Sequence, residues 1–188
     1  NTAKIGLSNE LLQRGSIQYV GSEIRAIILN KMAVAPQDDL VVIGGESIAI
    51  EAALIAAEGS VTAVEYSQAD RATLEDNVAH FDLHNVKIID HVDSESMKDC
   101  PVPSLVFLVA SASTDQELAY LIGINPNINV VIYTLDFKTA AGLPAALNAL
   151  GLEDVDTIQV SVSKLGSNHT FKTDPAPWII TARTRENK

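Results

Sequence analysis

Short apolar runs alternate with longer segments of mixed polarity through the middle of the chain. The runs lie at residues 40–43, 60–66, 86–90, 104–110 and 129–133. A short continuous apolar run is typical of a strand that is buried on both faces. Strands that alternate with helical segments predict a parallel sheet with helical crossovers. The alternation therefore restricts the chain to α/β folds in which helices cover both faces of a sheet.

Helices are predicted over residues 22–34, 47–57, 67–82, 114–124 and 136–150. Ser22 and Ser67 are the expected N-caps of the first and third of these helices. Pro144 is expected to kink or restart the last helix, and Gly151 is expected to end it.

The last third of the chain changes character. Residues 156–164 alternate apolar and polar side chains, residues 177–185 form another strand-like run, and turn-forming residues join them. This pattern predicts an antiparallel pair that closes the sheet. The expected fold is a three-layer Rossmann-like α/β sandwich with a mostly parallel, seven-stranded sheet and a C-terminal antiparallel hairpin. One domain is expected over residues 1–188, with an N-terminal arm and helix (1–36), a βα core (37–150) and closing strands (151–188).

The net charge of −11 disfavours two classes of partner. Nucleic-acid binding needs a dense Lys/Arg surface, and an anionic membrane surface attracts basic segments. Glu46 and Glu51 interrupt the longest apolar stretches, so none reaches the ~20 residues of a membrane span. No basic stretch leads into an apolar run, and we therefore expect a cytoplasmic protein.

Metal binding is not expected. Cys100 is the only cysteine, and no Cys/His cluster has the spacing of a zinc site. His80 and His84 stand four residues apart on a predicted helix end, but no third ligand accompanies them.

A nucleotide-type loop is predicted in the stretch "VVIGGESIAIEAAL", residues 41–54. Gly44 and Gly45 occupy the turn between the first strand and its helix, where glycine lets backbone N–H groups approach a ligand. Glu65 ends the second strand about 20 residues later, the spacing at which a carboxylate can bind ribose hydroxyls. Alternatively, Glu65 is an exposed carboxylate near the next helix, and Ser47 is an N-cap beside a solvated Glu46.

The loop lacks the longer glycine pattern of NAD-binding turns, and the chain has no Walker Lys-Ser/Thr pair. By fold-level analogy, the predicted strand plan is that of class I S-adenosylmethionine-dependent methyltransferases.

Several segments resemble one methyltransferase family, the decarboxylating precorrin-6Y C15-methyltransferases of cobalamin biosynthesis. The resemblance is carried by "SEIRAIILNKMAVAP", "SIAIEAAL", "VTAVEYSQADRATLEDNVAHFDLHNVKII", "VSVSK" and "PAPWIITA". It implies S-adenosylmethionine as methyl donor, an anionic tetrapyrrole substrate, C15 methylation with decarboxylation, and a homo-oligomer, often a tetramer. The cofactor-binding positions implied by the loop and the family pattern are Gly44, Gly45, Glu65, Asp93, Ala110 and Ser111.

The chain departs from the family pattern where strands end. Val42 stands at a usually acidic position, and the Gly44-Gly45-Glu46 loop is two residues shorter. Val92 replaces an acidic residue, with Asp93 one position later, and Tyr133 replaces an Asn. Two main hypotheses follow: an active methyltransferase, or a degenerate domain that binds the donor weakly or not at all and acts as a scaffold. A methyltransferase with another small acceptor is a third.

No catalytic residue can be named from the sequence. Tyr133 is a candidate for the substrate side of the cleft, although a packing role is the simpler interpretation. Candidate cations for the substrate carboxylates are Arg14, Arg25, Lys164, His169 and Lys172. The simpler interpretation is that they are solvated surface charges.

Overall fold

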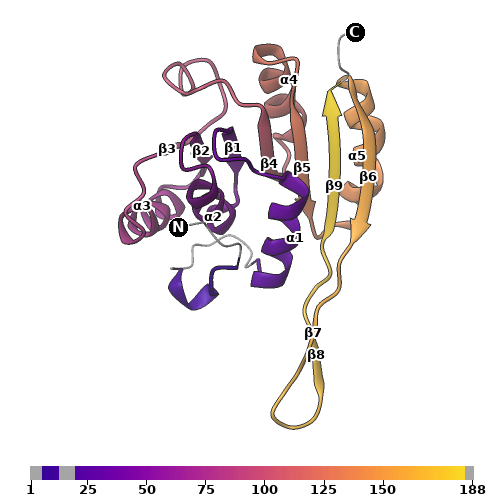
Figure 1. Cartoon of the computed structure of the whole chain (residues 1–188). Helices are drawn as coiled ribbons and strands as arrows, with labels where there is room; N and C mark the ends of the chain where they lie inside the picture. Colours follow the sequence, from indigo (N-terminus) through magenta and orange to yellow (C-terminus); the bar gives the residue numbers. More distant parts are fainter. Residues whose placement is uncertain (1–5, 13–19, 185–188) are drawn as a thin grey trace.

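The computed structural model describes residues 6–12 and 20–184. Its main sheet has seven strands in the order β3-β2-β1-β4-β5-β9-β6 (Figure 1). The strands are β1 (Asp39–Ile43), β2 (Ser60–Val64), β3 (Val86–Ile89), β4 (Leu105–Val109), β5 (Asn129–Thr134), β6 (Leu152–Gln159) and β9 (Trp178–Thr184). The helices are η1 (Asn9–Leu11), α1 (Ser22–Met32), α2 (Glu46–Ile55), α3 (Gln68–His80), α4 (Thr114–Ile124) and α5 (Phe137–Ala149).

The strand directions confirm the predicted topology. Strands β1 to β5 pair in parallel, β9 pairs antiparallel with β5, and β6 pairs antiparallel with β9. The carboxyl ends of the five parallel strands therefore meet at one edge of the sheet. Because β6 runs in the same direction as β5, the chain also leaves β6 at this edge.

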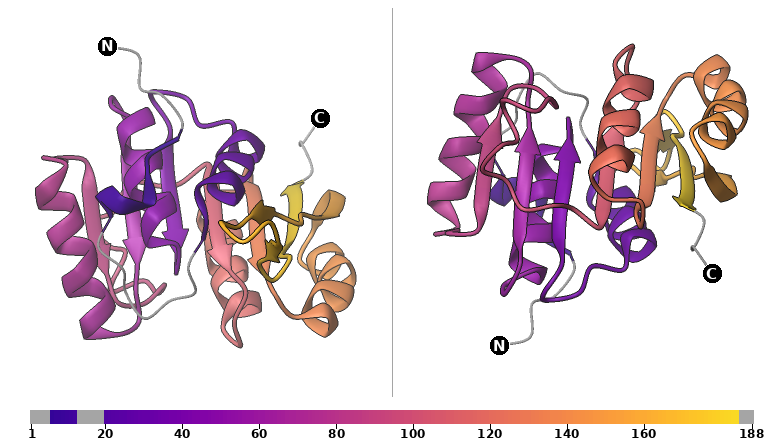
Figure 2. Two further views of the ribbon diagram at one scale, coloured as in Figure 1. Left: turned by 90° about the horizontal axis from the view of Figure 1, so that it is seen from below. Right: turned by 90° about the horizontal axis from the view of Figure 1, so that it is seen from above.

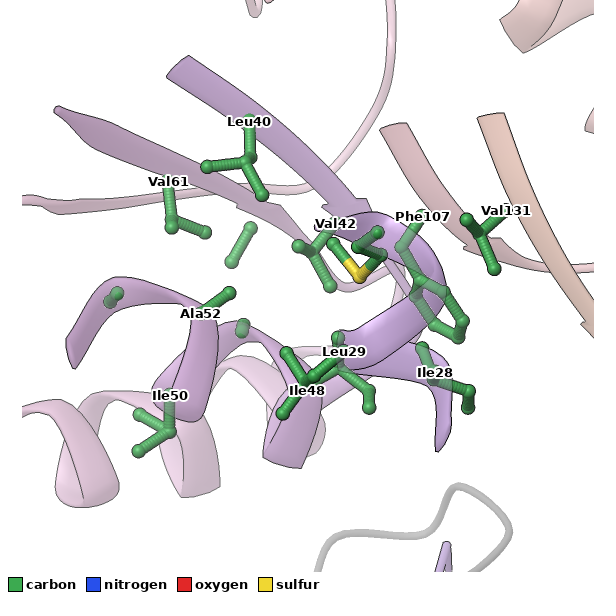
Figure 3. Close-up of a cluster of buried hydrophobic side chains, with 14 of the residues drawn as sticks. Ile28, Leu29, Leu40, Val42, Ile48, Ile50, Ala52, Val61, Phe107 and Val131 are labelled. Carbon is green, nitrogen blue, oxygen red and sulfur yellow. The ribbon is translucent and has the colours of Figure 1, made fainter. Parts of the chain in front are cut away.

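Alternate side chains of β1 supply two separate cores. Leu40 and Val42 belong to the core formed with α1, α2 and α3, and Val41 and Ile43 belong to the core with α4 and α5. Figure 2 shows α1 and α4 on opposite sides of the sheet, and Figure 3 shows the first core around Phe107. Burial on both faces explains why the parallel strands are continuously apolar.

Helix boundaries follow the sequence with three differences. Ser67 caps α3, since its side chain accepts a hydrogen bond from Asp70 N, but Ser22 does not cap α1, whose N-cap is Gly21. Helix α5 continues through Pro144, so the proline does not restart it. Gly151, with φ +87°, follows this helix as predicted. The third difference, at the start of α2, concerns the candidate site.

A second, two-stranded sheet is an element that the sequence interpretation missed. Strand β7 (Ser163–Leu165) begins at the end of the predicted strand 156–164 and pairs antiparallel with β8 (Phe171–Thr173), which lies in the segment expected to be turn. This hairpin projects beyond the carboxyl edge of the main sheet (Figure 1). Leu165 and Phe171 are 62% and 70% exposed. The hairpin therefore presents apolar side chains to solvent at the edge where ligands of this fold class bind.

Arg25 is buried in an ion pair and not available to a substrate, so its prediction as a substrate contact is wrong. Its Nε lies 3.4 Å from Glu51 Oε2, and the two side chains are 0% and 1% exposed. Arg25 also donates to Asn9 Oδ1 and to the carbonyl of Leu7. Glu51 Oε1 accepts hydrogen bonds from the N–H groups of Gly6 and Leu7. The pair thus fastens the arm segment 6–12 to α1 and α2.

Residues 6–12 and 20–184 contain neither a membrane-spanning helix nor a metal-binding cluster. No helix there is long and apolar enough to span a membrane. No group of three or more His, Cys, Asp or Glu side chains is arranged to hold a metal ion.

Candidate functional site

The predicted loop residues meet at the carboxyl edge of the sheet. Gly44 N donates to Val64 O at 2.9 Å, which holds the turn after β1 against the end of β2. Ala110 N donates to Tyr133 O at 2.8 Å, which extends the pairing of β4 and β5. In open α/β sheets, ligands bind at this edge. Gly44, Gly45, Glu65 and Ala110 therefore lie where a nucleoside-type ligand would be expected.

Both glycines of the turn are required by its geometry. Gly44 has φ +74°, a backbone conformation that side chains disfavour. Gly45 packs directly on the buried ring of Phe107. The close turn brings the start of α2 onto β4, so the predicted glycine turn is also a packing contact.

Replacing Gly45 with Ala is expected to lower the free energy of unfolding by about 1–3 kcal/mol, as for other overpacked cores. The new Cβ would lie 2.6 Å from Phe107 Cε1 and 3.0 Å from Cδ1. Urea denaturation measures the change. The double variant Gly45→Ala/Phe107→Leu should recover part of the loss, and a wild-type midpoint for Gly45→Ala alone would contradict this contact.

Glu65 is a buried carboxyl group, not an exposed one. It is 1% exposed, and its Oε2 is buried without a hydrogen-bond partner. Burial raises the pKa of Glu65 to about 8, with further contributions from the charges of Glu46 and Asp70. The alternative of an exposed carboxylate is therefore wrong. A buried acceptor with no donor is costly, and a ligand hydroxyl could satisfy it.

Glu46 is the first residue of α2, whose N-cap is Gly45, so Ser47 is not the cap. Glu46 is half-buried, one of its carboxylate oxygens is buried, and its charge raises the pKa of Glu65. The predicted solvated Glu46 is thus wrong, because its carboxylate lies near the end of β2. A second acidic group here favours a cationic ligand over an anionic one.

Tyr66 and Glu117 form a bridge that the sequence interpretation missed. Tyr66 Oη donates to Glu117 Oε2 at 2.6 Å, and the Tyr66 ring lies 6.2 Å from that of His91. Burial and the bond to Glu117 raise the pKa of Tyr66, and nearby Ser111 lowers it. Burial raises the pKa of Glu117. Because β1 lies between β2 and β4, this bridge spans the carboxyl end of β1.

A sequence signal for Glu117 exists in retrospect. The buried residues of α4 are Thr114, Glu117, Leu118 and Leu121, which recur with helical spacing. A carboxylate on the buried stripe of a helix needs a partner, and Tyr66 supplies it.

The remaining predicted positions, Asp93 and Ser111, are exposed. Asp93 Oδ1 accepts from Ser96 N at 2.7 Å, and this backbone hydrogen bond lowers the pKa of Asp93. Ser111 Oγ accepts from Ser113 N at the start of α4. Both residues stabilise local turns, and their roles in cofactor binding stay predictions. Arg14 lies outside the described residues.

A hollow of about 670 Å³ lies at the opposite edge of the sheet, beside the end of α1 and the starts of β4 and β5. None of the predicted site residues lines it. The arrangement of the strand ends, and not the size of this hollow, locates the candidate site.

Comparisons with known proteins agree with this geometry. A sequence profile described as a precorrin methyltransferase domain matches residues 15–181. The cobalt-precorrin-6B C(15)-methyltransferase (decarboxylating) of Salmonella typhimurium is 26% identical over 96% of this chain and 97% of its own length.

Two crystal structures share the fold. A precorrin-6Y C5,15-methyltransferase from Geobacter metallireducens has a TM-score of 0.84 at 22% identity, covering 96% of this chain and 98% of its own. A precorrin 8w decarboxylase of Methanobacterium thermoautotrophicum has a TM-score of 0.79 at 14% identity, covering 94% and 98%. At these identities, the likeness supports the fold.

Proposed function

The chain belongs to the precorrin methyltransferase domain family, and on that premise we propose that it methylates C15 of a precorrin. The methyl donor is S-adenosylmethionine, the substrate is an anionic tetrapyrrole of cobalamin biosynthesis, and decarboxylation accompanies methylation, as in the name of the Salmonella relative. The observation that carries the proposal is Glu65, a buried carboxyl with an unpartnered oxygen beside the glycine turn.

The residues at the carboxyl edge fit the donor. Glu65 Oε2 can accept a ribose hydroxyl, and the Gly44–Gly45 turn lets the donor approach the backbone. Glu46 adds a carboxylate near this position. The donor is positively charged at its sulfonium and its ammonium, so an inward carboxylate favours it.

The bound donor supplies an electrophilic methyl group, and the protein contributes binding, orientation and exclusion of water. Glu65 fixes the ribose, which sets the position of the rest of the donor. The Tyr66–Glu117 hydrogen bond joins the chain after β2 to α4 beside this site. No general acid or base is needed to activate the donor.

Binding of S-adenosylhomocysteine tests the proposal. At 100 times its dissociation constant, the ligand should stabilise the fold by about 2.7 kcal/mol, visible as a rise in Tm. Glu65→Ala is expected to remove this rise. Glu58→Ala, which removes an exposed carboxylate elsewhere, is the matched control and should keep it.

A wild-type protein with no rise in Tm at millimolar ligand would contradict the enzyme hypothesis. The scaffold alternative would then have to be reconsidered, although none of the comparisons favours it. A ligand-induced rise in Tm that persists in Glu65→Ala would mean that another residue binds the ribose.

The assembly and location are also part of the proposal. We propose a single domain over residues 1–188, a cytoplasmic location, and a homo-oligomer that includes the β7–β8 hairpin in its interface. Exposed Leu165 and Phe171 support this use of the hairpin, because large apolar side chains on a projecting element favour association. The net charge of −11 supports the expectation of no nucleic-acid or membrane partner.

The variant Leu165→Ser/Phe171→Ser is expected to sediment more slowly than the wild type, with the same Tm at low protein concentration. Sedimentation velocity measures the change. Equal sedimentation coefficients for the variant and the wild type would show that the hairpin is not part of the interface.

A further inference from the structure

A second cavity lies at the carboxyl end of β5, on the α1 face of the sheet. It measures about 230 Å³, and its wall is largely apolar. The lining includes Ile24, Tyr133, Leu135, Val160, Val162 and Pro177. Pockets that enclose a whole drug-sized ligand are larger, about 300–1,000 Å³. This cavity therefore suits one edge of a larger ligand.

Tyr133 gives the cavity a polar group. Its side chain is 4% exposed, and burial raises its pKa. Within residues 6–12 and 20–184, no hydrogen-bond partner of the Tyr133 hydroxyl is found. The hydroxyl oxygen is not among the fully buried polar atoms that lack a partner, so it is accessible from the cavity. An acceptor atom of a ligand that enters the cavity would satisfy it.

Two lysines stand near the mouth of the cavity. Lys164 and Lys172 are direct cross-strand partners in the β7–β8 hairpin. Lys164 Nζ lies 3.1 Å from Glu23 Oε1, and Glu23 also lines the cavity. Like charges directly opposite each other destabilise a strand pair. Glu23 relieves part of this repulsion at Lys164, and an anionic ligand would relieve it at Lys172. Glu23 and Asp174 also line the cavity, and the lysines offset the charge of these carboxylates at its mouth.

The cavity and the glycine turn lie at the same level of the sheet. Ile43 pairs with Leu108 and Val109 pairs with Tyr133, so Gly44, Val109 and Tyr133 continue one row across β1, β4 and β5. Two strand spacings separate the outer members of this row by about 10 Å. A donor at the turn and an acceptor in the cavity would thus be neighbours.

We propose that this cavity binds one carboxylate-bearing pyrrole ring of the methyl acceptor, with the Tyr133 hydroxyl donating a hydrogen bond to it. The ring enters the apolar space, and side-chain carboxylates reach the Lys164–Lys172 pair. This assignment rests on the proposed function, since the acceptor is taken to be a tetrapyrrole. Tyr133 is then a substrate-binding residue.

Two variants test the cavity. Tyr133→Phe removes only the hydroxyl, and it should raise the KM for cobalt-precorrin-6B about tenfold, which corresponds to about 1.4 kcal/mol. Val162→Phe fills the space and should weaken the binding of uroporphyrin, a tetrapyrrole probe with carboxylate side chains, at least tenfold by fluorescence anisotropy. Val102→Phe, at an exposed position elsewhere, is the matched control. Calorimetry should give the same Kd for S-adenosylhomocysteine in all variants.

Wild-type KM in Tyr133→Phe together with wild-type uroporphyrin binding in Val162→Phe would overturn the assignment. So would a wild-type protein that binds S-adenosylhomocysteine but no tetrapyrrole. A protein that binds no S-adenosylhomocysteine, yet loses uroporphyrin binding in Val162→Phe, would contradict the proposed methyl transfer and support the cavity.

Discussion

Replacing Arg25 with Met is expected to lower the free energy of unfolding by about 3–5 kcal/mol, the cost of breaking a buried ion pair by removing one partner. The variant leaves the Glu51 carboxyl group, which is 1% exposed, with the N–H groups of Gly6 and Leu7 as its donors among residues 6–12 and 20–184. Urea denaturation at neutral pH measures the loss from the midpoint and the slope.

The double variant Arg25→Met/Glu51→Leu removes both partners of the ion pair. Comparison with Arg25→Met separates the effect of losing the pair from the effect of leaving one buried carboxyl group without its partner. Apolar replacement of a whole buried pair is often neutral or stabilising, so most of the loss should be recovered. Lys98→Met, which breaks an exposed ion pair with Glu95, is the matched control and should change little. An Arg25→Met midpoint equal to that of the control would show that the pair contributes nothing.

The same variants connect the arm with the site. Glu51 lies on α2, which begins at the glycine turn, and it holds Gly6 and Leu7 of the arm. Figure 1 shows the arm segment 6–12 toward the same edge of the sheet as the β7–β8 hairpin. Loss of the pair is therefore expected to affect the surroundings of the donor site as well as stability.

Local patterns predicted the fold because they depend on neighbours in the chain. The apolar runs identified all five parallel strands, and the Ser67 cap and the α4 boundaries were also found. Strands β7 and β8 were missed because each has three residues and all of them are exposed, so no burial alternation marks them. Short exposed strands form through pairing, which the sequence pattern does not reveal.

The site was predicted less completely, because burial of a charge is a tertiary property. Glu65 was placed correctly by spacing, but its depth depends on the ends of the neighbouring strands. Arg25 reads as a surface cation, although it lies on the buried stripe of α1 with Ile24 and Ile28. The Tyr66–Glu117 bridge joins residues that are 51 positions apart.

Glu65 should make the stability of the protein fall as pH rises. In the unfolded chain a Glu side chain titrates near about 4.3, whereas burial holds the pKa of Glu65 at about 8 in the folded protein. Between these values the folded state binds more protons than the unfolded state. The contribution of Glu65 to the free energy of unfolding is therefore fully present below about pH 4.3, the pKa in the unfolded chain. It is lost as the pH rises toward 8, at a rate of at most about 1.4 kcal/mol per pH unit.

The pH dependence of stability is measured from urea midpoints at pH 5, 6, 7 and 8, for the wild type and for Glu65→Gln, whose side chain cannot ionise. The variant should lose less stability than the wild type over this range and should be the more stable protein at pH 8. Parallel curves for the two proteins would mean that Glu65 titrates normally in the folded state.

Binding of the donor should become stronger as pH rises, which is opposite to the effect of pH on stability. Ribose hydroxyls donate hydrogen bonds to Glu65, which favours its ionised form and lowers its pKa in the complex. Near pH 7, binding of S-adenosylhomocysteine should therefore release about one proton, and the affinity should increase between pH 6 and pH 8. Calorimetry in phosphate and in Tris should give different heats for the wild type and equal heats for Glu65→Gln. Equal heats for the wild type would mean that Glu65 keeps its proton when the donor binds, and that it acts as a neutral hydrogen-bonding group.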